Sequence, residues 1–277
     1  MLKVYNELGG KNVKSAERGD ANSFLRSVLV EVATENYRQL MFESLSLVPT
    51  NGARTPQLHL DPPLRANERV ISGLFANAIA RVAPRSRPEA RIDRTESQET
   101  IDALVNDDLG GAELKSRAGR VDYLAWYGQR IFGVELKAAA MNCEKPQLTE
   151  TVRNRWKTVV DQAKSAQTHL LELKRSEPHR YPSPASLALM VIIGRRSMAR
   201  QDREDDHNSQ IETMESDFMK AFTKLDPEPT FRALYTFPQE FRSLVPRKRG
   251  HADPSAGKAI YTPFVAFLAK SAIKGTS

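Results

Sequence analysis

The chain has 277 residues, and its 41 Lys and Arg against 34 Asp and Glu give a formal net charge of +7 at pH 7. A single cysteine, Cys143, excludes an internal disulfide and a multi-cysteine zinc site. The sequence shows no apolar run of about 18 residues and no apolar signal core after the first residues, which predicts a cytoplasmic protein with no membrane partner. The excess of basic residues favours polyanionic partners.

Residues 1–58 are predicted to form an N-terminal helical extension, and residues 59–277 the main domain. The extension contains a one-sided apolar pattern over residues 17–46, typical of an amphipathic helix. Its apolar positions are Phe24, Leu25, Val28, Leu29, Val32, Leu40 and Met41. The stripe can pack on the main domain, mediate dimerisation or bind another protein, and packing is the commonest outcome for such a pattern.

A second amphipathic helix is predicted over residues 63–82, closed by Pro84. Its apolar positions are Leu64, Ile71, Leu74, Phe75, Ala78, Ile79 and Val82. Glu68 lies on the same stripe and either faces a functional site or lies in water near the helix N-terminus, where acids are favoured. Residues 95–118 are interpreted as an insertion.

Two apolar, aromatic and β-branched runs flank Gly128-Gln129, which predicts a β-hairpin over residues 119–137 with a tight turn. Tyr127 would then pair with Arg130, and the same register places Asp122 opposite Glu135, with Cβ atoms about 5 Å apart. Lys137 alternates to the face of Glu135. Opposed acids are destabilising unless a cation lies between them, so this pattern predicts a Mg²⁺ or Mn²⁺ ion beside a phosphate.

The Glu-Leu-Lys sequence alone carries little information, because it also occurs at residues 113–115 and 172–174. Only the copy at 135–137 ends a strand-like run and has an acid on the partner strand. The alternative for this copy is a pair of solvated acids that Lys137 neutralises.

The rest of the chain predicts a helix over 148–174, a central buried strand over 186–194 and an edge strand over 231–237. A final apolar segment over 259–272 is expected to be helical after Pro263. Residues 200–210 are interpreted as a charged loop and 246–258 as a basic linker. Arg195 and Arg196 directly follow the predicted central strand and are candidates for contacts with a nucleic-acid backbone. A generally basic surface without a groove remains the alternative.

At these residues, the chain resembles the PD-(D/E)XK phosphodiesterase superfamily over about residues 63–194. Asp122 matches the first acid of its motif and Glu135-Leu136-Lys137 matches (D/E)-x-K, although Val121 stands in place of the proline. The resemblance implies an α/β, restriction-endonuclease-like core with a central mixed β-sheet flanked by helices. Some members carry a Gln, four residues before a Tyr, on the second helix. Here Gln162 is followed by Ala166, so we expect it to be a surface residue.

The resemblance implies a metal-dependent nuclease acting on nucleic acid, with DNA as the expected substrate. Asp122, Glu135 and the Leu136 carbonyl would bind Mg²⁺ or Mn²⁺, Lys137 would act on the attacking water, and Glu68 would be an outer ligand. Three further possibilities stay open. One is a catalytically silent or partner-regulated nucleic-acid-binding module with the same fold. The second is a basic nucleic-acid-binding protein in which the hairpin carboxylates have no role. The third is a nuclease subunit switched by a helicase or other protein in a prokaryotic defence, restriction or repair complex.

Overall fold

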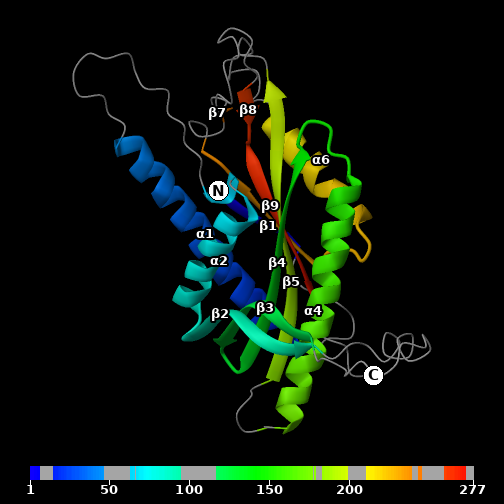
Figure 1. Ribbon diagram of the computed structural model, residues 1–277. Helices are drawn as coiled ribbons and strands as arrows, with labels where there is room; N and C mark the ends of the chain where they lie inside the picture. Colours follow the sequence, from blue (N-terminus) through cyan, green and yellow to red (C-terminus); the bar gives the residue numbers. More distant parts are fainter. Residues whose placement is uncertain are drawn as a thin grey trace.

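The structure is a computed structural model that describes residues 1–6, 15–46, 63–65, 67–94, 117–176, 178, 183–198, 210–238, 243–244 and 259–272. These residues form a mixed β-sheet between two layers of helices, so the α/β class is confirmed (Figure 1). The strand order is β1-β6-β9-β5-β4-β3-β2, with β7 and β8 attached beside β5. β4 and β5 pair in parallel, whereas the other pairs described are antiparallel.

The strands are β1 (Leu2–Asn6), β2 (Arg85–Arg94), β3 (Arg117–Tyr127), β4 (Arg130–Asn142), β5 (Ser183–Met198), β6 (Phe231–Thr236), β7 (Ser243–Leu244), β8 (Ala259–Tyr261) and β9 (Phe264–Ser271). The α-helices are α1 (Ser15–Ser46), α2 (Glu68–Val82), α4 (Glu150–Ser176) and α6 (Ile211–Ala221). Short 3₁₀ turns at Pro63–Arg65 and Phe222–Lys224 complete the described elements.

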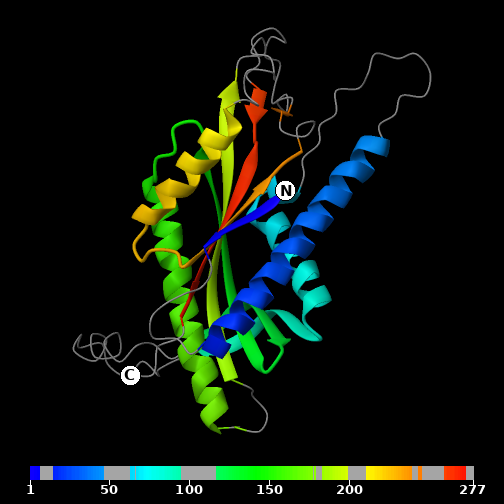
Figure 2. The same ribbon diagram turned by 180° about the vertical axis from the view of Figure 1, so that it is seen from behind.

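Helices α1 and α2 cover one face of the sheet, and α4 and α6 cover the other (Figures 1 and 2). The apolar stripe of α1 is buried with α2 and the sheet in one core cluster, so its predicted packing on the main domain is confirmed. The N-terminal residues also supply β1, which pairs with β6. The predicted boundary at residue 58 lies outside the described residues.

Helix α2 begins later than its apolar pattern suggests. Asn67 is its N-cap, with the side-chain oxygen accepting from the Val70 N–H, and Pro63–Arg65 forms a separate 3₁₀ turn. An Asn at this position satisfies an N–H that has no partner within the helix. Glu68 is therefore the first residue of α2.

The hairpin prediction is confirmed in its turn and in the register of the residues next to the turn. Tyr127 pairs with Arg130, and the ladder continues to Tyr123 opposite Val134. Gly128 has φ of 57°, in the left-handed region that glycine occupies without strain, as the two-residue turn requires.

Two predictions for the C-terminal part are wrong. The segment after Pro263 is strand β9 and not a helix, and β6 lies between β1 and β9 and not at an edge. A continuous apolar run suits either a buried helix or a strand that is covered on both faces, and here β9 is covered by both helix layers. The sequence pattern also did not indicate β1, β2 or α6.

The central strand is confirmed, since β5 lies between β4 and β9 and is buried on both faces. It runs past Gly194, where a Cβ atom would collide with the ring of Phe264. Arg195 and Arg196 therefore lie within the strand and not after it. The predicted insertion at 95–118, loop at 200–210 and linker at 246–258 lie wholly or almost wholly outside the described residues. None of the described helices has the length and apolar character needed to cross a membrane.

Candidate functional site

Strands β3 and β4 separate halfway along their length. Their described pairing ends at Tyr123 opposite Val134. Beyond this point β3 stays paired with β2 as far as Arg117, while β4 stays paired with β5 as far as Asn142. From Glu135 onward, no described strand pairs with the side of β4 that faced β3. We call this opening the split.

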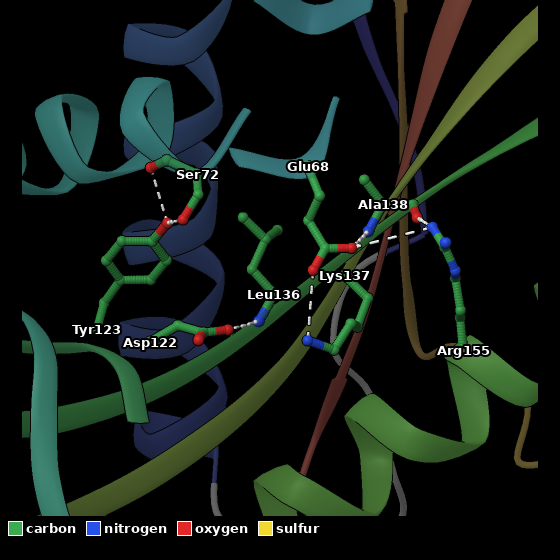
Figure 3. A network of polar contacts seen from close by, with 8 residues as sticks. All are labelled: Glu68, Ser72, Asp122, Tyr123, Leu136, Lys137, Ala138 and Arg155. Atoms are coloured by element: carbon green, nitrogen blue, oxygen red, sulfur yellow. Dashed lines mark hydrogen bonds and ion pairs between the residues drawn. The ribbon is translucent and has the colours of Figure 1, made fainter. Parts of the chain in front are cut away.

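Two carboxylates cover the backbone of β4 at the split (Figure 3). Asp122 Oδ2 accepts a hydrogen bond from the Leu136 N–H at 2.7 Å, and Glu68 Oε2 accepts one from the Ala138 N–H at 3.0 Å. Residues two apart in a strand point their N–H groups to the same side, so two acids from different elements replace one missing partner strand. A backbone N–H left without any partner would cost about 1–3 kcal/mol.

Two cations lie beside Glu68. Lys137 Nζ is 3.4 Å from Glu68 Oε1, and Arg155 Nη1 is 3.9 Å from Glu68 Oε2. Arg155 extends from α4 and also donates from Nη1 to the carbonyl oxygen of Ala138. The split thus joins side chains of α2, β3, β4 and α4 in one polar network (Figure 3).

Glu135 lies on the strand between these groups and exposes only 2% of its surface. Leu136 packs in the core cluster of α1 and α2, so alternation directs Glu135 towards the α4 layer, where neighbouring Gly133 approaches Leu170. The predicted direct pairing of Asp122 with Glu135 is not part of the described ladder. The strands diverge one position earlier, and Asp122 bonds the next residue along β4 instead.

A cavity of about 670 Å³ opens next to the split, between α2 and the β2–β3 pair. Its lining residues are Glu68, Arg69, Ser72, Gly73, Ala76, Pro88, Glu89, Asp122, Tyr123 and Leu136. The Tyr123 hydroxyl donates to the Ser72 carbonyl at 2.7 Å and lies 2.5 Å from the Ser72 hydroxyl, which ties α2 to β3. Burial raises the pKa of Tyr123, and nearby carboxylates raise it further, so the phenol remains a donor at neutral pH.

The other predicted site residues lie elsewhere. Arg195 is opposite Asn142 on β4, five positions beyond Lys137, which is about 16 Å along the strand. Arg196 is largely buried and pairs with Glu144 at 3.2 Å. Gln162 is half-buried and not exposed as expected, and its Oε1 atom has no hydrogen-bond partner among the described residues.

Arg155 was not singled out from the sequence. It is one of several basic residues on α4, and nothing in the local pattern distinguishes it from Arg153 or Lys157. Its contacts with Ala138 and Glu68 depend on how α4 packs against β4, which a single sequence does not reveal.

The oxygen atoms around the split are of the type that Mg²⁺ and Mn²⁺ prefer. The carboxylates of Asp122 and Glu68 and the backbone of Leu136 meet at this place in the fold, and Glu135 lies on β4 next to Leu136 with its side chain directed towards the α4 layer. Across the described part of the chain, however, no three His, Cys, Asp or Glu side chains converge as a ready metal-binding group. The chemistry of the donors fits a divalent ion, and the assembled ligand set stays a prediction.

Cys143 does not belong to this site and is expected to be inert. Burial raises the pKa of its thiol to about 12. At pH 8 the folded protein should therefore hold about a thousandfold less thiolate than the unfolded chain, and thiolate is the reactive form. We expect a thiol reagent such as DTNB to modify Cys143 only after urea is added. Rapid modification of the native protein would contradict this.

Comparisons of the chain with models of protein families, with curated proteins and with solved structures found no match.

Proposed function

We propose that the protein is a metal-dependent nuclease that hydrolyses phosphodiester bonds of nucleic acid, with DNA as the substrate. The observation that carries this proposal is the polar network at the split. Asp122 and Glu68 lie on the uncovered side of β4, and Lys137 lies beside Glu68. A buried acid, Glu135, lies between them on the same strand. Two acceptors are enough for the two N–H groups of β4 that face the split, whereas this place also has a third acid, Glu135, and a lysine.

Asp122, Glu135 and the carbonyl oxygen of Leu136 would hold Mg²⁺ or Mn²⁺, with Glu68 as an outer ligand. When bound there, the ion supplies Lewis-acid polarisation of a phosphoryl oxygen and lowers the pKa of a water molecule. Burial of Glu135 favours this role, because a carboxylate shielded from water gains more from a nearby cation than an exposed one.

Lys137 acts on the attacking water and on the phosphate. Its ammonium group donates hydrogen bonds, so it orients the water and offsets the negative charge that develops on the phosphoryl oxygens. A new bond forms between the water oxygen and phosphorus, and the bond from phosphorus to the leaving ester oxygen breaks. The protons of the water pass to solvent and to the leaving oxygen. Nothing in this scheme requires a covalent enzyme intermediate.

The net charge of +7 supports a nucleic-acid substrate, since Lys and Arg supply most of the non-specific affinity for phosphate backbones. A helicase or another protein that switches the nuclease, in a prokaryotic defence, restriction or repair complex, remains part of the proposal.

The test is cleavage of plasmid and single-stranded DNA by the purified chain with Mg²⁺, with Mn²⁺ or with EDTA. Lys137→Ala should lower the cleavage rate by about 10²–10³-fold, because a donor to the reacting groups is lost. Lys164→Ala removes the same charge from an exposed position on α4 and should leave the rate unchanged. Cleavage that persists in EDTA, or equal rates for wild type and Lys137→Ala, would reject this site.

A catalytically silent nucleic-acid-binding module is the second candidate. One observation favours it: Glu68 is already engaged by Lys137, by Arg155 and by the Ala138 N–H. This candidate predicts DNA binding that does not respond to chelator and no cleavage with any divalent metal.

A further inference from the structure

Arg155 is anchored at the split by one edge of its guanidinium group. Its described contacts, to the Ala138 carbonyl and to Glu68, both use Nη1. The side chain remains 47% exposed. A guanidinium group has five N–H donors in a planar fork, so most of the donors of Arg155 are available on its outer side.

The two contacts do not use up the charge of Arg155. The Ala138 carbonyl is neutral, and the distance of 3.9 Å to Glu68 is too long for a hydrogen bond. Glu68 has a nearer cation in Lys137, at 3.4 Å. Half-exposed ion pairs of this kind contribute little to stability, so neutralising Glu68 does not by itself explain an arginine at this place.

The surroundings of Arg155 suit a polyanion. Lys137 lies on the other side of the Glu68 carboxylate, and Arg69, in the first turn of α2, is exposed on the wall of the adjacent cavity. Arg155, Lys137 and Arg69 come from α4, β4 and α2 and lie around the split. Figure 3 shows Arg155 and Lys137 on either side of Glu68. A planar guanidinium held at one edge can bind two oxygens of one phosphate with its other edge.

We infer that Arg155 binds a backbone phosphate of the nucleic acid at the split, an inference that rests on the proposed function. The Ala138 carbonyl holds one side of the guanidinium group, and the outer side takes the phosphate. Arg155 thereby positions the nucleic-acid strand across β4, with Lys137 beside the neighbouring phosphate of that strand. This makes α4 a wall of the substrate path as well as a support of the sheet.

Binding of fluorescein-labelled single-stranded and duplex oligonucleotides, measured by anisotropy in EDTA over a series of NaCl concentrations, tests the role without cleavage. Arg155→Gln keeps a polar side chain with N–H donors but loses the charge and the fork. We expect about tenfold weaker binding. The slope of the logarithm of the binding constant against log [NaCl] should be shallower by about 0.7–0.9. Arg155→Lys should recover part of the affinity and the full slope. Thermal melts of each variant check that the fold is retained.

Lys157→Gln is the matched control, because it removes one charge from the same helix at an exposed position two residues away, on the opposite side of α4. Its slope should equal that of the wild type. Equal losses for Arg155→Gln and Lys157→Gln would overturn the inference in favour of a diffuse basic surface. Wild-type affinity and slope in Arg155→Gln would overturn it in favour of a structural role through Ala138.

The outcomes separate this inference from the proposed function. If the wild type cleaves DNA and Arg155→Gln binds normally, the nuclease stands and the role of Arg155 fails. If the wild type binds DNA without cleaving it and Arg155→Gln weakens binding, the phosphate-binding role of Arg155 is supported and the proposed nuclease function is rejected. A wild-type chain that binds neither oligonucleotide overturns both.

Discussion

Replacing Asp122 with Asn is expected to abolish DNA cleavage while leaving the fold intact. Asn keeps a side-chain oxygen that can accept from the Leu136 N–H, which Asp122 Oδ2 now accepts at 2.7 Å. It removes the negative charge that a divalent ion needs from this position. The expected loss is about 10³-fold or more in cleavage rate at saturating Mg²⁺, with an unfolding free energy within about 0.5 kcal/mol of wild type.

Asp122→Ala separates the two roles of this carboxylate. It should lose cleavage to the same extent and also lose about 1–3 kcal/mol of stability, because the Leu136 N–H is left without its acceptor. Rates from a plasmid-nicking assay and unfolding free energies from urea titrations give both quantities. Wild-type cleavage by Asp122→Asn would mean that Asp122 only covers the backbone of β4.

Of the substitutions proposed for this protein, Trp156→Ala should cause the largest loss in the free energy of unfolding, about 3–5 kcal/mol. Trp156 is fully buried in the core between α4 and the sheet, and its indole Nε1 donates to the Pro227 carbonyl at 2.6 Å. The substitution leaves a cavity the size of an indole and removes the partner of that carbonyl. Urea unfolding followed by circular dichroism measures the effect.

Trp126→Ala is the matched control for Trp156, since the chain has two tryptophans and Trp126 is only partly buried on β3 near the hairpin turn. It should cost about 1 kcal/mol. Because Trp156 adjoins Arg155, its loss should also weaken DNA binding where the folded state persists. Equal destabilisation by the two substitutions would show that α4 is not anchored through Trp156.

The hairpin was predictable from the sequence because its information is local. A glycine with positive φ selects the turn, and the turn fixes the register of the residues next to it, from Tyr127 opposite Arg130 to Tyr123 opposite Val134. The register could not be extrapolated one step further to Asp122 and Glu135. Whether two strands remain paired depends on what each pairs with on its other side, which the hairpin sequence does not contain.

The site was predictable only as a set of residue types. The motif residues Asp122 and Lys137 and the helical Glu68 are brought together at the split, whereas Arg195 and Arg196 lie further along β5, and Arg155 takes a place that no pattern indicated. A basic residue on an amphipathic helix looks the same in the sequence whether it faces water or a break in a sheet. The packing of α4 on β4 makes the difference.

The sequence by itself determined the amphipathic helices α1, α2 and α4, the buried strand β5 and the turn at Gly128, because periodicity and backbone preference act over a few residues. The tertiary structure decided that the run at 264–269 is a strand, that β6 is internal and that β3 leaves β4 at Asp122. These features arise from pairing and burial between segments far apart in the chain, where the free energy of the whole sheet outweighs local preference.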